Sequence, residues 1–448
     1  MQPRSDEFLE YLAELNDLPE DQLGESQEFE IAIATLYKRL RKKKRRLTGQ
    51  QRKRADREAV REIAAARDTT SNTHELPTGT PVEFQHKSRT CYCCNRPYRS
   101  VHPSYHWLCV PCGNLSADKR TQKADLTGHR ALLTGGRIKI GFQTACWLLR
   151  SGASVDITTR FPVDATSRFS ELKDFDSFKQ RLRIYPVDFR NLKLLMDFIS
   201  VYREQTEALD ILIHCAAQSV RRSQTWHERL LNHERNASLT SEQRGLIANF
   251  SNSELGHIAE SSTSSAPEEF SQLSLLQRDD DDRSDAREKN TWNSDLLETQ
   301  PVEILEALLV NSNAPAMLTQ GLYSLLKNSS NANRFIVNVV GADSMFSLDK
   351  SGYHPHVNMS KAALNMMTKS CARRFAADKV FINSVDTGWI THEGGASRRA
   401  ERQQEGFRPP YDHIDGAARI LDPILKVVSG QCEPQWGFLF RNFKPFSW

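Results

Sequence analysis

The sequence ALLTGGRIKIG occupies residues 131–141 and decides the fold of this chain. Its apolar start predicts a strand, its glycines predict a tight turn, and residues 142–150 continue as a helix. Residues 153–159 predict a second strand, so about thirty residues make one βαβ unit. At the start of such a helix, free backbone N–H groups can bind phosphate. The turn therefore predicts a dinucleotide site bracketed by Gly135 and Gly141, or else a plain connection between strand and helix.

The same alternation continues along the chain. Further strands are predicted at residues 182–187, 209–217, 334–340, 380–385 and 436–440, and helices at 192–204, 302–327, 361–378 and 417–428. Alternating strands and helices are typical of an α/β fold. The sequence predicts a Rossmann-type doubly wound parallel sheet, with helices on both faces, over residues 125–448.

Residues 222–297 interrupt this alternation. They are rich in Ser, Asn and Glu and contain four consecutive aspartates. This composition predicts a largely disordered, acidic and Ser-rich insertion. Because the insertion follows a strand end, where ligands bind in such sheets, it is either a lid or a tolerated surface extension, and we favour the extension.

Residues 1–85 predict a polar, helical and partly disordered arm that precedes the folded domain. A short apolar stripe at helical spacing is formed by Phe29, Ile33, Leu36 and Leu40. Residues 69–81 have the composition of a linker.

A basic cluster follows the stripe. Residues 38–54 contain eleven Lys or Arg among seventeen positions and no aromatic side chain. The cluster predicts a nuclear-import signal or a surface for nucleic acid or acidic partners, although a solvated helix face explains it equally well. Without aromatic side chains, the cluster offers no platform for base stacking.

Two Cys-x2-Cys pairs mark a small module at residues 86–120. Cys91 and Cys94 form the first pair, and Cys109 and Cys112 form the second, fourteen residues later. Each pair can place two thiolates on one turn, and four thiolates suit a tetrahedral Zn²⁺. Because four protein ligands leave no open position, the expected zinc is structural and supplies folding free energy.

Neighbouring side chains leave the ligand set of this module open. Cys91 and Cys93 form a competing Cys-x-Cys pair, and His102 or His106 can replace one thiolate. Four buried cysteines without a metal are the remaining alternative.

The composition predicts neither a membrane-spanning nor a secreted chain. No run of about eighteen apolar residues occurs, and the sequence MQPRSDEFLEYL lacks the apolar core of a secretory signal. Nine cysteines, several in close pairs, fit metal binding or reduced thiols better than a disulfide framework. We therefore expect a cytoplasmic and/or nuclear location.

In order and spacing, these motifs resemble those of the short-chain dehydrogenase/reductase family over residues 126–221 and 298–448. The turn from Thr134 to Gly141 resembles the family's TGxxxGxG motif, with Lys139 in place of the central glycine. The chain is more similar still to a subgroup with a four-cysteine segment, a TGGRxKIG turn and an HPHxNMxKAALN helix. The resemblance implies a Rossmann fold and a nicotinamide cofactor.

The resemblance also implies cofactor contacts by position. Asp188 matches the acidic residue that holds the adenine ring, and Ala216 lies in a HCAA segment where the family has NNAG. Gly388 and Thr391 match the family's PGxxxT segment beside the nicotinamide, with Thr391 one place early.

The departures from the family concern the proton donor. Lys361 matches the lysine of the YxxxK motif and Asn311 the structural and proton-relay asparagine, but Val357 stands at the tyrosine position and Gly341 at the serine position. In the family's chemistry the tyrosine protonates the substrate oxygen, and the lysine binds the ribose and lowers the tyrosine pKa. Loss of this acid should cost several orders of magnitude in carbonyl reduction. We hypothesise that His354, seven residues before Lys361, replaces the acid; a packing or capping histidine is the alternative.

The end of the second strand predicts the cofactor preference. It reads TTR at residues 158–160, without the acidic residue that NAD-preferring relatives place there for the ribose 2′-OH. Arg160 and Arg137 offer guanidinium groups that match phosphate geometry, so we predict NADP(H) over NAD(H). Lys139 either contacts the pyrophosphate or fills the turn so that no dinucleotide fits.

Together these patterns predict an NADP(H)-binding oxidoreductase that acts on a carbonyl or alcohol with an atypical proton donor. The alternative is a catalytically inactive dinucleotide-binding scaffold or sensor that contacts partners through its zinc module and basic arm. The resemblance further implies a homodimer or homotetramer, because family members pair through the helices that hold Asn311 and Lys361.

Overall fold

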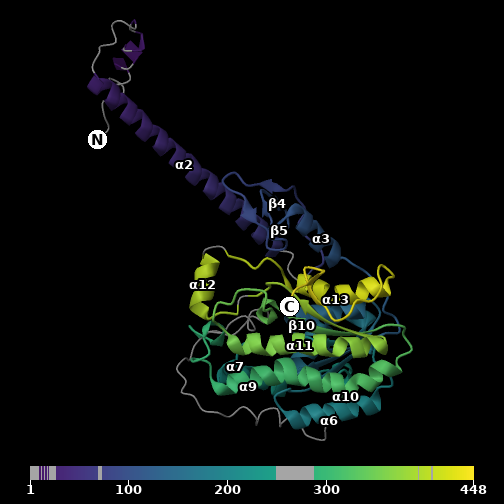
Figure 1. The fold of residues 1–448 in the computed structure, drawn as a ribbon. Coiled ribbons are helices and arrows are strands. Elements are labelled where there is room, and N and C mark those ends of the chain that lie inside the picture. The colour runs from purple at the N-terminus through teal and green to yellow at the C-terminus, as the bar shows by residue number, and fades with distance from the viewer. Residues whose placement is uncertain are drawn as a thin grey trace.

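An eight-stranded sheet forms the centre of the computed structural model (Figure 1). The structure describes residues 10–11, 13–14, 16–17, 19, 27–68, 73–248, 287–391, 393–404 and 407–448. The strands are β6 (Arg130–Thr134), β7 (Ser154–Thr159), β8 (Leu182–Pro186), β9 (Ile211–His214), β10 (Arg334–Val340), β11 (Val380–Asp386), β12 (Leu439–Arg441) and β13 (Lys444–Phe446). Their order is β13-β12-β11-β10-β9-β6-β7-β8, and all neighbours are parallel except β12 and β13. Because the order reverses between β6 and β9, this is a doubly wound Rossmann-type sheet, which confirms the predicted fold class.

Helices cover both faces of the sheet. One face is covered by α4 (Lys139–Arg150), α5 (Pro162–Ser170) and α13 (His413–Val428); the other is covered by α6 (Leu192–Gln205), α10 (Ala314–Asn328) and α11 (Pro355–Ala377). Leu133 packs in the first core and Leu132 in the second, because successive strand side chains point to opposite faces. Burial on both faces explains the apolar runs in the central strands, such as residues 131–133 of β6 and 211–213 of β9.

The helix predicted over residues 302–327 has an irregular turn. It consists of α9 (Pro301–Leu308), a π-helical turn at Leu309–Asn313, and α10. Pro315 lies in the first turn of α10 and has no N–H to donate, which interrupts the regular hydrogen-bond ladder. The π-helical turn places Asn311 at the predicted site.

The predicted disordered insertion at residues 222–297 is wrong at its two ends. Residues 224–236 form α7 (Gln224–Asn236), followed by α8 (Ser241–Gly245), and Ile247 bridges to Ile184 of β8. At the other end, Thr291–Asn293 forms a short 3-10 helix. Ser223 and Thr240 cap the two helices, a local stabilisation that composition alone does not reveal. The aspartate run at residues 279–282 lies outside the described residues.

The N-terminal arm contains a 42-residue helix, α2 (Gln27–Asp68). Figure 1 shows it reaching from the body of the molecule toward the N-terminus. Its last turns carry buried side chains, among them Ile63 and Arg67, so this end belongs to the folded part. None of the helices within the described ranges has the length and apolar character needed to cross a bilayer.

The cysteine module lies between α2 and the sheet domain. It contains a three-stranded sheet of β1 (Val82–Glu83), β4 (Ser100–His102) and β5 (Tyr105–Cys109), a two-stranded sheet of β2 (Arg89–Thr90) and β3 (Pro97–Tyr98), and α3 (Val110–Arg120). Its small apolar core includes Tyr105 and Leu108 and extends to Ile390 and Tyr411 of the sheet domain.

A buried charge network joins the module to α13. The carboxylate of Asp415 is fully buried and accepts a hydrogen bond from the Tyr105 hydroxyl (2.8 Å). Arg67 of α2 and Arg120 of α3 both pair with Asp415 and with Asp412. Three segments distant in sequence therefore meet at one pair of carboxylates.

Candidate nucleotide site and cysteine cluster

The glycine turn is packed tightly against the strand beside it. The Thr134 hydroxyl accepts hydrogen bonds from the N–H groups of Cys215 and Ala216, both at 3.0 Å. Gly135 has a φ of 73°, and a Cβ there would lie 2.7 Å from Ala216 Cα. A Cβ on Gly141 would lie 2.1 Å from the Gly135 carbonyl oxygen. Both glycines are thus required for the turn's own packing as well as for a predicted ligand.

Lys139 occupies the turn in an unusual way. Its φ is 54°, a left-handed conformation that favours glycine. Its ammonium lies 3.3 Å from Glu393, whose carboxylate also accepts a hydrogen bond from Thr391 (2.8 Å) and lies 3.9 Å from Arg222. Burial opposes ionisation of Glu393, but Lys139, Thr391 and Arg222 outweigh it and lower its pKa to about 2. An ionised carboxylate therefore lies at the start of α4, where phosphate was expected.

The two arginines predicted to bind phosphate differ in their surroundings. Arg137 pairs with Asp164 at 2.6 Å and stacks over Phe161. Arg160 also lies over the Phe161 ring, but it has no ion pair within 4 Å among the described residues. Burial, together with Arg190 and Arg137 nearby, lowers the Arg160 pKa to about 10. The cation that can best take up an incoming anion is therefore Arg160.

Asp188 lies at the end of β8 in a charged setting. Arg190 contacts both of its carboxylate oxygens, at 2.6 to 3.1 Å. Burial disfavours the charged form of Asp188, but Arg190 and Arg160 prevail and lower its pKa. The predicted adenine-binding acid is thus held by a neighbouring guanidinium.

Helix α7 covers the adenosine side of the predicted site. The Glu234 carboxylate accepts hydrogen bonds from the N–H groups of Val163 (2.9 Å) and Asp164 (2.8 Å), the first residues of α5. Trp226 lies edge-on against Phe161, with ring centroids 5.9 Å apart. Burial raises the Glu234 pKa to about 7. This part of the insertion is therefore ordered and packs against the start of α5 and against Phe161.

Asn311 organises the loop that follows β9. Its carbonyl accepts from the Gln218 N–H (2.7 Å), and its amide donates to the Gln218 carbonyl and to Ser360 Oγ, both at 3.0 Å. With no exposed surface, Asn311 joins the π-helical turn, the β9 loop and α11. This arrangement agrees with the structural half of its implied role.

Lys361 lies on α11 with its ammonium buried at the end of β10. It donates to the Val339 carbonyl at 2.9 Å. Burial lowers its pKa to about 8, while Cys215 and Asp343 act in the opposite direction. Four residues earlier, Val357 is buried in the core. The predicted site therefore has the Lys361 amine but no hydroxyl group at position 357.

His354 is held by a carbonyl and a carboxylate. It begins α11 with a φ of 44°, its Nδ1 lies 2.9 Å from the Trp292 carbonyl, and its Nε2 lies 3.2 Å from Asp343. Its ring stacks on Trp292 at 4.1 Å. A Cβ on Gly341 would lie 3.3 Å from Asp343 Oδ2, so this carboxylate fills the space beside the position of the family's serine. His354 and Asp343 thus form a pair at the end of β10.

The cysteine module contacts the loop after β11. Gly388 has a φ of 79° and donates its N–H to Asp386 (2.9 Å). The next N–H, of Trp389, donates to the hydroxyl of Tyr92, and the Trp389 ring donates to the Thr391 carbonyl, both at 2.9 Å. The module therefore positions the backbone of the segment predicted to lie beside the nicotinamide.

The four predicted metal ligands converge. The Sγ atoms of Cys91, Cys94, Cys109 and Cys112 all lie within 4.8 Å of one another. Four sulfurs bound to one Zn²⁺ at about 2.3 Å would be about 3.8 Å apart, so the donor set and its spacing fit this metal. The cluster includes neither Cys93 nor the two alternative histidines. His102 accepts a hydrogen bond from the Ser104 N–H, and His106 lies beside the Arg408 carbonyl.

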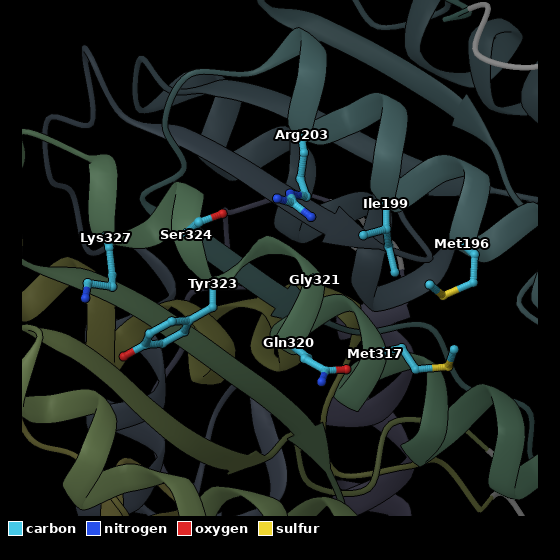
Figure 2. A pocket seen from close by; sticks show the side chains of 9 residues that line it. All are labelled: Met196, Ile199, Arg203, Met317, Gln320, Gly321, Tyr323, Ser324 and Lys327. Atoms are coloured by element: carbon cyan, nitrogen blue, oxygen red, sulfur yellow. The ribbon is translucent and has the colours of Figure 1, made fainter.

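A separate groove lies between α6 and α10 (Figure 2). It has a volume of about 560 Å³ and is lined by Met196, Ile199, Arg203, Met317, Gln320, Gly321, Tyr323, Ser324 and Lys327. None of the predicted site residues lines it, so it is not part of the nucleotide site.

Comparisons with known proteins agree with this architecture. Residues 286–408 match the family model described as enoyl-(acyl carrier protein) reductase. The chain is 29% identical, over 358 residues, to an uncharacterised protein of Acanthamoeba polyphaga mimivirus, a match that covers 77% of this chain and 73% of that protein.

Several solved structures are also similar to this chain. Pseudomonas aeruginosa RhlG in its NADP complex is 16% identical with a TM-score of 0.45, covering 70% of this chain and 95% of that one. A short-chain dehydrogenase from Burkholderia cenocepacia in complex with NADP is 19% identical with a TM-score of 0.44, covering 70% and 96%. The carbonyl reductase Sniffer of D. melanogaster is 17% identical with a TM-score of 0.43, covering 72% and 100%. The strand order, rather than these likenesses, defines the fold.

Four residues at the site carry no pattern that the sequence analysis could use. Asp343 and Glu393 lie in loops after strands, Glu234 lies in the region expected to be disordered, and Tyr92 lies between two metal-type cysteines. Each reaches the site through tertiary packing. Asp343 is the exception, because it lies only two residues after Gly341, a position from which an acid could replace the missing serine.

Proposed function

We propose that this chain is an NADP(H)-dependent oxidoreductase of the short-chain dehydrogenase/reductase type that acts on a carbonyl or alcohol. One observation carries the proposal: the glycine turn, Asn311, Lys361 and Gly388 meet at the carboxyl ends of β6, β9, β10 and β11. Ligands bind at this edge in doubly wound sheets. The reductase model matched by residues 286–408 supports the same class of reaction.

The residues of this chain fit a phosphorylated dinucleotide. The first turn of α4 would hold the pyrophosphate, and Arg160, with Arg190 and Arg137 nearby, would hold the 2′-phosphate. Lys361 would donate to the ribose. When bound, the nicotinamide supplies or accepts a hydride.

We assign proton transfer to the His354–Asp343 pair. An N–H of the His354 ring can donate either to the Trp292 carbonyl or to the Asp343 carboxylate. That proton can pass to a substrate oxygen near the position of the missing serine, and the Asp343 carboxylate steadies the ring. Asp343 also interacts electrostatically with Lys361, which links the pair to the ribose site.

The test combines binding and turnover. We expect NADPH to bind more tightly than NADH by calorimetry, and Arg160→Glu to weaken NADPH much more than NADH. Arg203→Glu, in the groove of Figure 2, makes the same charge change away from the site and should alter neither affinity. Equal loss of both nucleotides in Arg160→Glu, or no binding of either, would overturn the proposal.

NADPH oxidation over a panel of ketones, aldehydes and enones then tests the chemistry. We expect His354→Gln and Asp343→Asn to lower kcat by about 10²–10⁴-fold while leaving NADPH affinity unchanged. Turnover that survives both changes would remove this pair from the mechanism.

A catalytically inactive scaffold is the second candidate. The ion pairs Lys139–Glu393 and Arg137–Asp164 favour it, because both occupy cations that a cofactor would use. Tight NADPH binding without turnover on the whole panel would support the scaffold over the enzyme.

We also propose that the cysteine cluster holds a structural Zn²⁺. Four thiolates with no open position would contribute stability rather than chemistry. Metal analysis of the purified protein should give one zinc per chain, and zinc absent from protein that remains folded would contradict this assignment.

For assembly, we propose a homodimer or homotetramer through α9 and α11. Leu305 on α9 and Met359 and Met366 on α11 are exposed apolar side chains on adjacent helices. Sedimentation should show an oligomer that Met366→Glu dissociates.

A further inference from the structure

The N-terminal part of α2 stands clear of the other residues that the structure describes. Every residue from 31 to 47 is exposed, whereas contacts with the body begin at Asp56, which accepts hydrogen bonds from the N–H groups of Gln85 and His86. The contacts continue at Ile63 and Arg67. Figure 1 shows this part of α2 projecting from the body. At a rise of 1.5 Å per residue, a projecting stretch of about twenty residues is about 30 Å long.

This projecting segment carries a narrow apolar stripe. Ile33, Leu36, Leu40 and Leu47 are 42%, 44%, 55% and 45% exposed. At 100° per residue they lie within an arc of about 60° on the helix surface. Their spacing of three, four and seven residues places Ile33, Leu40 and Leu47 at a positions and Leu36 at a d position of a heptad, with Lys43 at the d position between Leu40 and Leu47. A stripe this narrow is typical of a helix–helix seam, whereas a helix lying in an apolar layer needs about 100° or more.

The charges beside the stripe rule out pairing with a second copy. The e and g positions that flank it hold Arg39, Lys44, Arg46 and Lys53 among others, and no Asp or Glu occurs between residues 31 and 55. In a parallel pair, Arg39 of one helix would face Lys44 of the other, and an antiparallel pair would likewise oppose cations. Like charges at these positions destabilise the pair and select an oppositely charged partner.

We propose that residues 31–54 of α2 dock an amphipathic helix of another protein, one with an apolar seam and Glu or Asp at its flanking positions. Such a partner covers the apolar stripe and neutralises the flanking cations at once. A nucleic acid would satisfy the cations alone and leave the four apolar side chains in water. The proposal is independent of the nucleotide site, which lies at the other end of the cysteine module.

The experiment titrates the full chain with a synthetic helical peptide that has Ile and Leu at its a and d positions and Glu at its e and g positions. The control peptide has Lys at the e and g positions. We expect the Glu peptide to bind at least about tenfold more tightly than the Lys peptide, by calorimetry at physiological salt. Leu40→Gln combined with Leu47→Gln should weaken binding of the Glu peptide at least about tenfold.

Ile31→Gln is the matched control. Ile31 is 61% exposed on the same helix, but lies about 180° from Leu40, outside the stripe. We expect this variant to bind the Glu peptide as the natural chain does, and all variants to keep the same thermal unfolding of the body. Equal weakening by the control and by the stripe variant would overturn the proposal, as would no binding.

Two further measurements separate the other occupants. Self-association that is lost in the stripe variant, seen by sedimentation, would replace the proposed partner with a second copy. Binding to duplex DNA or to anionic vesicles that is tighter than binding to the Glu peptide and unaffected by the stripe variant would identify a polyanion surface instead. Either result would overturn the proposal.

Discussion

Neutralising Glu393 should tighten NADPH binding while it lowers the stability of the free protein. Its carboxylate lies 3.3 Å from the Lys139 ammonium, at the start of α4, and receives a hydrogen bond from Thr391. A dinucleotide pyrophosphate at this helix end must compete with that carboxylate for the same cation. Glu393→Gln keeps the size and shape of the side chain and removes only the charge.

The size of the effect follows from the Glu393 pKa. A fall from 4.5 to about 2 corresponds to about 3 kcal/mol in favour of the ionised side chain in the folded protein. Because this folded-state pKa is depressed, the stability is present above the unfolded pKa of 4.5 and is lost as the pH falls toward 2. At pH 7, Glu393→Gln should therefore destabilise the free protein by up to about 3 kcal/mol. Because the carboxylate would no longer compete for Lys139, part of this free energy, about 1–2 kcal/mol, should be gained on NADPH binding, which would then be five- to thirtyfold tighter.

Calorimetry and thermal unfolding test both halves of this prediction. The variant should melt at a lower temperature without nucleotide and show a larger NADPH-induced increase in Tm. Glu242→Gln removes a carboxylate from an exposed ion pair with Lys179 and should change neither quantity by much. If NADPH affinity were equal or weaker in Glu393→Gln, then Glu393 would order the loop rather than occupy the anion site, and our reasoning would be refuted.

Three further predictions concern Lys361, the cysteine cluster and Asp415. Burial lowers the pKa of Lys361 to about 8. Below pH 8, keeping this side chain charged in the folded protein therefore lowers the free energy of unfolding by about 3 kcal/mol, and this cost disappears above the unfolded pKa of 10.5. At pH 7, Lys361→Met should thus raise the free energy of unfolding, and this gain should vanish near pH 10.5. The variant should also abolish turnover. Denaturant unfolding at both pH values tests the direction of the stability change. Cys94→Ser, or chelation, should lower Tm and the zinc content, whereas Cys432→Ser, at an exposed cysteine outside the cluster, should change neither. Asp415→Asn should cost about 3–5 kcal/mol of stability in denaturant unfolding, because the buried Arg67 and Arg120 would then share the single carboxylate of Asp412; a cost below 1 kcal/mol would show that the network is dispensable.

Much of the fold could be predicted from local patterns. The strands at 182–187 and 334–340 and the glycine turn were recognisable because apolar runs and glycines reflect burial and backbone conformation directly. The predicted Cys-x2-Cys pairs converge for a similar reason, since their spacing sets their geometry. The ordered helix α7 could not be predicted, because its stability depends on packing against α5 and Phe161 rather than on its polar composition.

The residues predicted for the site lie near one edge of the sheet, whereas several of their contacts depend on segments distant in sequence. Thr134, Asn311 and Lys361 lie where motif order placed them, since strand ends in a parallel sheet share one edge. The partners of Arg137 and Lys139 were not foreseeable. Asp164 and Glu393 lie 27 and 254 residues away, so no local spacing reports those ion pairs.

By itself, the sequence of this chain determined the alternation of strands and helices, the edge of the sheet where the predicted site residues lie, and the four cysteines that converge. These depend on hydrophobic periodicity and on residue spacing, which neighbouring positions express directly. The tertiary structure alone decided which charges meet. It placed Glu393 on Lys139, Asp343 on His354 and two arginines on Asp415, because electrostatic contacts act through space between segments that folding brings together.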